Sequence, residues 1–348
     1  MDTLVLEKRK KELLAVSLET RMPEMFFCKK FFGRTVLSKK DAIRHDYVNT
    51  GSNEAHFGSR HDMRSPKTIN KDDSDTQQHT VGKSFEQIRL DSEDDQLEIS
   101  PGETPYGGIS NAYSRDARAI IQLENRNTRL IEKMAVNIAT NGTYTNGNYT
   151  YNIQRNSALN ITNSSADRWN QTSADILQQL VTFSNTMQRT AGVIPDTMVI
   201  GQSVLAPLLN NAKIQNLLDN RRIMIGQLSN LSRTSATVFY VGMLPPGLNV
   251  YLYLESTKGS SASLDNTFAN TDFIFPINKI MLGSSQMQGI KYFGPVKPSL
   301  GQRNLVPAQR LIDIYWDAPT KDYYYRIESR PIVFPAMRNS FLTAQVLA

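Results

Sequence analysis

The sequence predicts an α+β protein, because three of its segments differ in hydrophobic pattern. Apolar residues recur at helical spacing over 110–140, helices and short strands alternate over 172–282, and strands dominate 283–348. The chain has 348 residues, the length of two or three average domains or of one elaborated domain with extensions, and its 40% of hydrophobic residues are enough for a core. We therefore expect a long helix, a sheet covered by helices, and further C-terminal strands.

The first 35 residues combine a basic helix with a group of aromatic residues. Apolar and basic residues share helical spacing over 7–21, and Pro23 ends that pattern. Four phenylalanines follow, which need an apolar surface to cover them: Phe26, Phe27, Phe31 and Phe32. Two interpretations stay open, since these rings can pack on the core of their own chain or dock an N-terminal arm on a neighbouring subunit.

Residues 46–102 are rich in Ser, Asp, Asn, Gly and His and poor in apolar side chains. A buried loop of this length is uncommon in a compact domain, so we expect a protruding loop or β-hairpin. Its return limb is the strand-like run 84–90, which contains Phe85, Ile88 and Leu90. An acidic run follows over 91–103.

The histidines are the first candidates for a metal site, and all four lie in or beside this loop: His45, His56, His61 and His79. Clustered histidines can bind zinc or nickel. Their spacing, however, matches neither a ligand pattern nor one face of a helix. The single cysteine, Cys28, also excludes a cysteine-based zinc cluster. We expect no metal and no cofactor.

The helix over 110–140 spans roughly 45 Å at 1.5 Å per residue. It is expected to end at Asn141-Gly142, and a second Asn-Gly pair, Asn146-Gly147, predicts a hairpin. Charged residues that fall between its apolar positions define the face expected to be exposed: Arg115, Asp116, Arg118, Glu124, Arg126, Arg129, Glu132 and Lys133.

The remaining elements follow from short apolar runs. A helix from 173 should end near Gly192, and a second helix over 204–218 should have Ser203 as its N-cap. Pro331 and Pro335 restrict the last strand to an edge or a bulge. The expected strands cover 197–201, 237–241, 250–254, 273–282, 311–316 and 323–334.

The sequence lacks the motifs of common enzymes. It has no G-x-x-x-x-G-K-[ST], G-x-G-x-x-G, H-E-x-x-H or G-x-S-x-G motif. Lysines beside Cys28 could favour a thiolate, but no base accompanies it in a recognisable context. We expect no catalytic residue. An enzyme hypothesis would rest on three loop carboxylates: Asp91, Asp94 and Asp95.

Charge and hydropathy constrain the partners. The net charge is +6, and basic residues gather near the N-terminus, so non-specific contact with nucleic acid is expected. Aromatic residues are not interleaved with these cations as a stacking platform. No apolar run approaches the roughly 20 residues that span a bilayer, and the N-terminus lacks a signal-peptide core, so we expect no membrane partner.

The order of these segments resembles that of tailed-bacteriophage major capsid proteins with the Hong Kong 97-type fold, and most of all the lambda-type (capsid E) family. Short runs in the same order carry the resemblance: 23–32 (PEMFFCKKFF), 173–176 (SADI), 195–201 (PDTMVIG), 275–283 (FPINKIMLG), 289–294 (GIKYFG), 328–334 (ESRPIVF) and 341–348 (FLTAQVLA).

The resemblance implies a division of the chain. Residues 1–35 would be the N-terminal arm and 46–102 the extended loop, which overlaps a neighbouring subunit. The peripheral domain would combine 36–45, 103–171 and 283–348, with 110–140 as its spine helix, and the α/β axial domain would be 172–282. Candidate contacts between subunits are Phe26, Phe27, Phe31, Phe32, Phe85, Ile88 and Leu90.

The resemblance also implies a function and partners. Copies of the chain would form hexamers and pentamers and close an icosahedral shell around double-stranded DNA, with separate scaffold, portal and decoration proteins. The protein would be part of the virion and assemble in the cytoplasm of the bacterial host. Two other hypotheses remain, an encapsulin-like nanocompartment shell and a non-specific DNA-binding protein.

Overall fold

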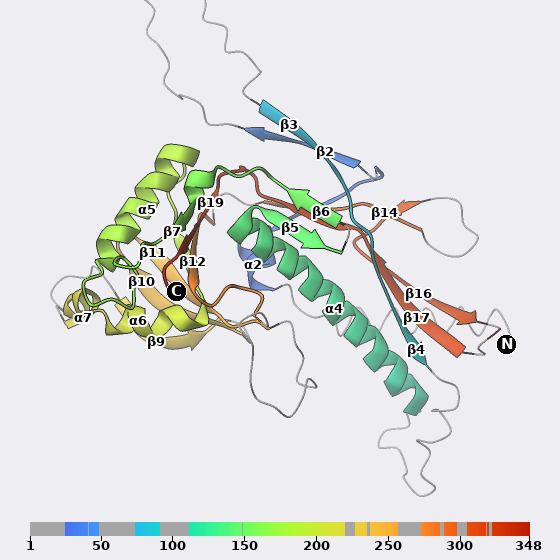
Figure 1. Ribbon diagram of the computed structural model, residues 1–348. Coiled ribbons are helices and arrows are strands. Elements are labelled where there is room, and N and C mark those ends of the chain that lie inside the picture. Colours follow the sequence, from blue (N-terminus) through green and yellow to red (C-terminus); the bar gives the residue numbers. More distant parts are fainter. Residues whose placement is uncertain are drawn as a thin grey trace, which may run out of the picture.

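Helix α4 (Asn111–Asn141) is the longest element, and the other elements are arranged along it (Figure 1). The computed structural model describes residues 25–40, 42–48, 74–90, 111–147, 149–219, 227–234, 237–256, 273–285, 289–297, 305–317, 319 and 322–348. A large sheet with its helices lies towards the C-terminal end of α4, and a smaller sheet lies along its N-terminal half. The helix predicted over 110–140 is confirmed.

The large sheet has seven strands of mixed direction. Their order is β7 (Asn160–Thr162), β19 (Phe341–Gln345), β12 (Lys279–Gly283), β8 (Thr197–Ile200), β11 (Leu248–Tyr253), β10 (Val238–Leu244) and β9 (Gln227–Arg233). The predicted domain boundaries at 172 and 282 divide this sheet, because β7 and β19 lie outside them.

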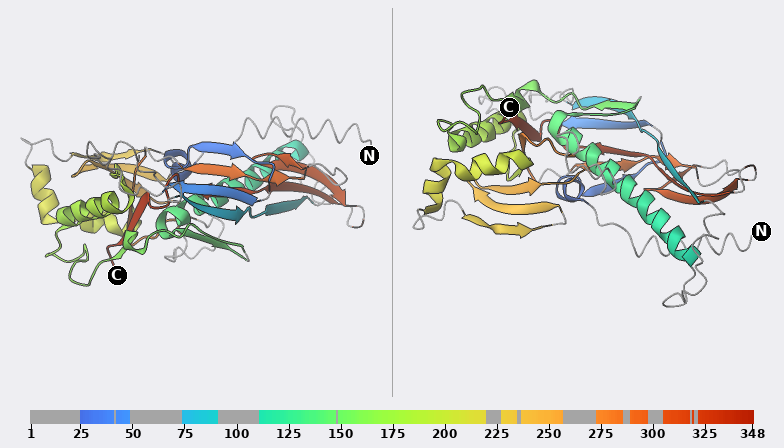
Figure 2. Two further views of the ribbon diagram at one scale, coloured as in Figure 1. Left: turned by 90° about the horizontal axis from the view of Figure 1, so that it is seen from above. Right: turned by 60° about the horizontal axis from the view of Figure 1, so that its bottom comes forward.

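Three helices accompany the seven-stranded sheet: α5 (Ile176–Ala191), α6 (Leu205–Asn210) and α7 (Ala212–Asp219) (Figure 2). They share one apolar core with strands β8, β10, β11, β12 and β19. The helix that ends near Gly192 is confirmed, with Gly192 in the left-handed conformation at φ 67°. The single helix predicted over 204–218 is wrong. Asn211 has extended backbone and separates α6 from α7, and the residue at the N-cap of α6 is Val204 rather than Ser203.

Two three-stranded sheets complete the described body. One has the order β16 (Leu311–Asp317), β17 (Asp322–Ser329) and β4 (Ser84–Leu90), and packs on α4 through Ala119, Ile120, Leu123, Tyr325 and Ile327. The other has the order β1 (Arg34–Leu37), β13 (Ile290–Phe293) and β18 (Pro331–Phe334). The strand predicted over 323–334 is therefore two strands, and Pro331 begins an edge strand, as expected for a residue without an N–H donor.

Three two-stranded ribbons pair only within themselves: β2 (Ala42–Val48) with β3 (Ser74–Thr80), β5 (Thr143–Asn146) with β6 (Tyr149–Asn152), and β14 (Pro295–Val296) with β15 (Val306–Pro307). The strand predicted over 84–90 is confirmed as β4, but its expected role as the return limb of the loop is wrong, because β4 pairs with β17 and the limb that pairs with β2 is β3. Strands β5 and β6 confirm the predicted hairpin. The strand predicted over 273–282 is shorter than expected, because Phe273 makes only an isolated bridge before β12.

Several expectations fall outside the described residues: the basic helix over 7–21, His56, His61 and the three loop carboxylates at 91, 94 and 95. Among the described helices, none combines the length and apolar character needed to cross a lipid bilayer.

Candidate subunit interface

The aromatic arm is fixed to its own chain. Helix α2 (Phe26–Lys30) lies against α4, and Phe27, Phe31 and Phe32 have no exposed surface, while Phe26 is 9% exposed. Their rings contact Tyr253, Phe275 and Phe341 at centroid distances of 5.3–6.1 Å. These rings therefore pack in the core of their own chain, which was the first of the two interpretations of the sequence. They leave little side-chain surface for a neighbour.

A buried carboxylate holds the start of α2. Both oxygens of Glu132 accept backbone N–H groups, from Phe27 at 2.7 Å and from Cys28 at 3.0 Å, and the Tyr253 hydroxyl donates to it at 3.1 Å. These N–H groups have no partner within a helix at its first turn, so a carboxylate there satisfies them. Glu132 thereby connects the arm, α4 and β11.

Burial raises the pKa of Glu132, although the N–H donors of Cys28 and Phe27 oppose the rise. Burial also raises the pKa of the Cys28 thiol, and the nearby Glu132 carboxylate raises it further. A buried thiol with a raised pKa is a poor nucleophile. The geometry therefore gives no support to a catalytic Cys28.

The charged face predicted for α4 is wrong at two positions. Glu132 is fully buried and Glu124 is 3% exposed, because α2 and the β16–β17–β4 side of the molecule cover the helix. Glu124 forms an ion pair with Arg310 at 2.9 Å. The sequence gives no sign of this burial, because both glutamates fall between the apolar positions of the helical pattern, where exposed charged residues are expected.

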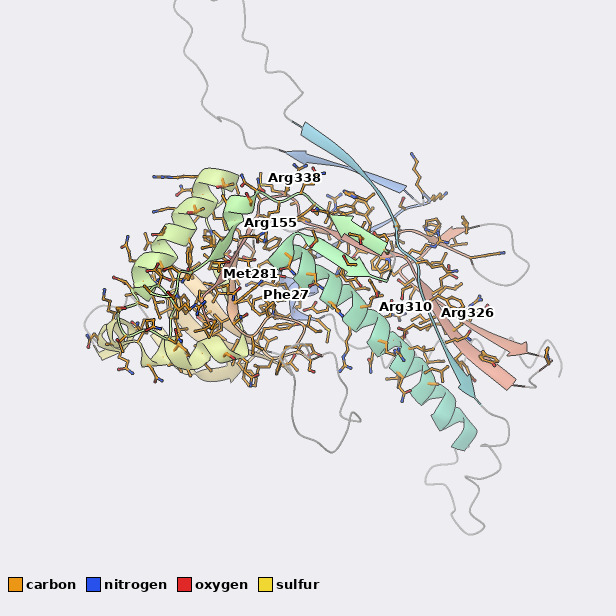
Figure 3. All side chains as sticks on the ribbon, in the orientation of Figure 1. Phe27, Arg155, Met281, Arg310, Arg326 and Arg338 are labelled. Atoms are coloured by element: carbon orange, nitrogen blue, oxygen red, sulfur yellow. The ribbon has the colours of Figure 1, made fainter. Side chains whose placement is uncertain are left out.

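Ion pairs connect α4 with the small sheet and link strands within that sheet. Arg126 binds Glu86 on β4 at 2.7 Å, and Arg326 on β17 binds Asp313 on β16 at 3.2 Å. Arg310 and Arg326 lie in this part of the molecule, beside α4 and the sheet (Figure 3). The first ion pair fixes β4 on the helix, and the second connects two strands within the sheet. Backbone pairing joins β4 to β17.

Phe85 is the predicted contact residue that the structure leaves most open. Its ring is 46% exposed, with Lys83 Nζ at 5.1 Å from the ring centroid and the Arg326 guanidinium at 5.5 Å. Ile88 is on the opposite face of β4 and packs against the core formed with α4. For Leu90 only the backbone is described, as the last residue of β4.

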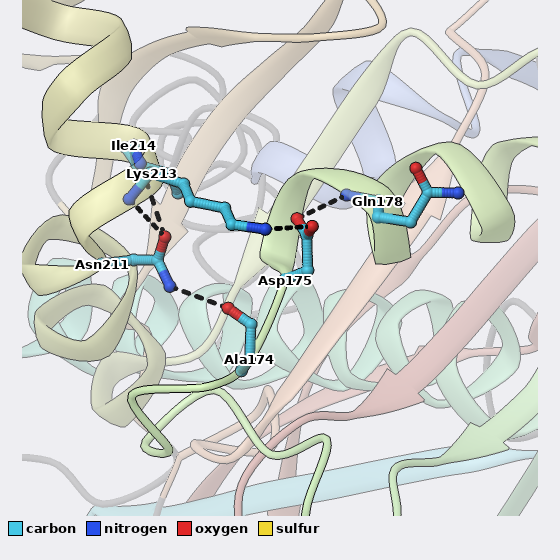
Figure 4. Close-up of polar contacts among 6 residues, drawn as sticks. All are labelled: Ala174, Asp175, Gln178, Asn211, Lys213 and Ile214. Carbon is cyan, nitrogen blue, oxygen red and sulfur yellow. Dashed lines mark hydrogen bonds and ion pairs between the residues drawn. The ribbon is translucent and has the colours of Figure 1, made fainter.

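Polar contacts connect α7 with α5 and with the segment that precedes α5. Asp175 caps the helix by accepting the Gln178 N–H at 3.1 Å and forms an ion pair with Lys213 on α7 (Figure 4). Asn211 donates to the Ala174 carbonyl at 3.1 Å and accepts the Lys213 N–H at 3.1 Å. Asn211, which breaks the predicted helix, thus joins the segment before α5 to the start of α7.

In the described part of the chain, no group of three potential metal ligands comes together. His79 packs edge-on against Tyr151 with ring centroids 4.5 Å apart, and it also lies beside Phe334 at 5.5 Å. For His45 only the backbone is described, in β2. A hollow beside α6 and α7 is lined by Trp169, amide and hydroxyl side chains and small residues, none of which is an acid or a base.

Comparisons with known proteins agree with this geometry. The sequence matches the phage major capsid protein E family over residues 83–346. Comparison with curated protein sequences gives no match.

Solved structures give the fold. A protein assigned as a prophage capsid protein of Escherichia coli CFT073 has a TM-score of 0.67 and 15% identity, with 97% of this chain and 98% of that chain covered. A phage-related protein from Bordetella bronchiseptica RB50 has a TM-score of 0.54, 11% identity and 96% coverage of both chains. The capsid of Ralstonia phage GP4 has a TM-score of 0.50 and 7% identity, with 94% and 92% covered. The fold is the Hong Kong 97-type capsid fold. The family match covers well over half of the chain, which therefore belongs to the phage major capsid protein E family and is a shell-forming component of a virion.

Proposed function

We propose that copies of this capsid protein form hexamers and pentamers and close an icosahedral shell around double-stranded DNA. The observation that carries the proposal is the ribbon β2–β3, which pairs only with itself and lies at the margin of the molecule in Figure 1. A two-stranded ribbon is at best marginally stable alone, so contact with another subunit would add to its stability. Many weak contacts of this kind become strong when they act together in a closed assembly.

Within this proposal, Phe85 is the contact residue with the best support. Aromatic and arginine side chains are enriched where interfaces hold most of their binding energy. Phe85 offers a half-exposed ring next to Arg326 and Lys83, on strand β4. Burial of that ring on assembly would remove apolar surface from water. Ile88 packs towards α4 and would hold strand β4 in place, so Phe85 would be the first of the two to meet a neighbour.

The proposal includes partners that only an assembled particle would reveal. Scaffold, portal and decoration proteins are expected to be separate chains, and assembly is expected in the cytoplasm of the bacterial host. The family is a structural one, and we propose that this chain catalyses no reaction.

Negative-stain electron microscopy of the purified protein, alone and with a co-expressed scaffold protein, tests the function. Closed shells together with hexameric and pentameric rings are the expected result. Nuclease-protected DNA inside particles from infected or induced cells would support the capsid. Shells that contain protein cargo and no DNA would identify a nanocompartment instead, and small uniform particles under all conditions would contradict both.

A further inference from the structure

The segment that joins the arm to the body is strongly basic. Residues 25–40 contain Lys29, Lys30, Arg34, Lys39 and Lys40 and no Asp or Glu. The segment forms α2 and the edge strand β1, which pairs with β13 and leaves its other edge open. The chain from β13 continues through Gly294 into β14, after which Lys297 follows.

Four cations of this segment, together with Lys297, are exposed and lack an ion-pair partner among the described residues. Lys29, Arg34, Lys39, Lys40 and Lys297 are all exposed, and within the described part of the chain none of them forms an ion pair. We call these five residues the basic ridge. Lys30 is excluded from it, because its ammonium group lies over the Tyr251 ring at 5.4 Å.

The carboxylates of the described part do not balance this charge. Every carboxylate whose side chain is described has a partner elsewhere: Glu86, Glu124, Glu132, Asp167, Asp175, Asp196, Glu255, Asp313 and Glu328. The charges are thus segregated. Acids stabilise the interior and the helix ends, while the ridge keeps unpaired cations.

A cation on an edge strand can also serve only to prevent pairing with another sheet. That role concerns Arg34 on the open edge of β1 and does not require cations on α2, after β1 or after β14. Strand β1 spans roughly 10 Å from Arg34 to Leu37 at about 3.3 Å per residue, and Lys39 and Lys40 follow it directly across a bend. Duplex DNA presents about one charge per 1.7 Å of its axis, so unpaired cations gathered within a short stretch of chain suit a phosphate backbone.

We propose that the basic ridge is the surface that binds the phosphates of double-stranded DNA without sequence preference, an inference that rests on the proposed capsid function. Lysine ammonium groups act as mobile point charges, and no base-reading motif accompanies them. Each phosphate neutralised releases counterions, so the ridge determines how steeply affinity falls with salt.

The test compares two double variants of the full-length protein. Lys39→Gln/Lys40→Gln removes two ridge charges. Lys133→Gln/Arg189→Gln removes two exposed cations, from α4 and α5, that form no ion pair with any described residue. Affinity for a short duplex of random sequence is measured over a series of NaCl concentrations. Loss of two phosphate contacts should make the negative slope of log K against log salt shallower by about 2 in the ridge variant. The control variant should keep the wild-type slope.

Equal slopes in the two variants, or no binding of duplex DNA by the wild type at low salt, would overturn the inference. Stronger ridge-dependent binding to polyglutamate than to duplex DNA would assign the ridge to an acidic protein segment and overturn it as well. Electron microscopy of the same samples separates the two proposals. Shells that form with an unchanged slope reject the ridge alone, whereas a wild-type protein that never forms shells rejects the capsid function.

Discussion

Phe27 and Phe85 show how one residue type serves the core at one position and the surface at another. Phe27 has no exposed surface and contacts Tyr253 and Phe275, whereas 46% of Phe85 is exposed. Phe27→Ala should lower the free energy of unfolding by about 3–5 kcal/mol, because it leaves a cavity.

Phe85→Ala should leave the melting temperature within a few degrees of wild type and reduce the yield of shells. Thermal unfolding and particle counts measure the two effects, and normal shells from Phe85→Ala would refute its contact role.

Glu132 makes stability depend on pH. Burial raises its pKa above the usual 4.5, so the folded protein holds this proton more tightly than the unfolded chain does. The contribution of Glu132 to stability is therefore greatest at low pH and falls as the pH rises through the raised folded value. Glu132→Gln lacks this titration but also loses an acceptor for the two N–H groups of α2.

The difference in melting temperature between wild type and Glu132→Gln should therefore change between pH 4.5 and neutral pH. The wild type should lose stability relative to the variant as the pH rises. Cys28 and Tyr253, which face the same carboxylate, have raised pKa values and stay protonated over this interval. A difference that stays constant with pH would show that Glu132 keeps one protonation state throughout.

At the scale of elements, Arg155 fixes the C-terminal end of α4. Its guanidinium donates to the Ala139 carbonyl at 2.7 Å and to the Thr140 carbonyl at 2.5 Å, and it also contacts Asn160 at the start of β7. These carbonyls belong to the last turn of a helix, which has no further N–H groups to offer them. Burial lowers the pKa of Arg155 to about 10, which leaves it charged at neutral pH.

Arg155→Met should keep much of the packing and lose the hydrogen bonds. Hydrogen bonds to charged groups contribute about 1.5–3 kcal/mol, so we expect a loss of at least about 2 kcal/mol in the free energy of unfolding. Hydrogen exchange should increase first in the last turn of α4 and in β7. Chemical denaturation with exchange measurements provides the test, and an unchanged stability would mean that water replaces the guanidinium.

The sequence predicts elements better than it predicts their partners. Helical and alternating patterns locate α4, α5 and β4 to within a few residues, since these depend on local periodicity. The break at Asn211 depends on hydrogen bonds to a distant segment, and the burial of Glu132 depends on N–H groups more than a hundred positions away. Long-range contacts of this kind leave no local signal. The basic segment at 25–40 is visible in the sequence, but its lack of ion pairs is not.

At the scale of the whole molecule, the arm and the loop differ in how they are held. Residues 26–32, the described part of the arm that carries the phenylalanines, are held in the core by Glu132 and by the packing of their rings. The ribbon β2–β3, in contrast, pairs only with itself, and His79 at its base packs on Tyr151 and Phe334. The body should therefore fold without the distal part of the loop, while assembly should need it.

The register of the ribbon allows a direct test of that separation. Val48 lies opposite Ser74, so residues 49–73 can be replaced by Asn-Gly, which closes a two-residue hairpin at this position. We expect the shortened protein to fold with a melting temperature close to that of wild type, because no described core residue is removed. We also expect that it will form no closed shells, and that any particles will be no larger than single capsomers. A control variant, Asn146→Asp, changes the last residue of β5, keeps Gly147 after it, and should assemble normally. Closed shells from the shortened protein would show that 49–73 is dispensable, and a large loss of stability would show that the loop belongs to the folded body.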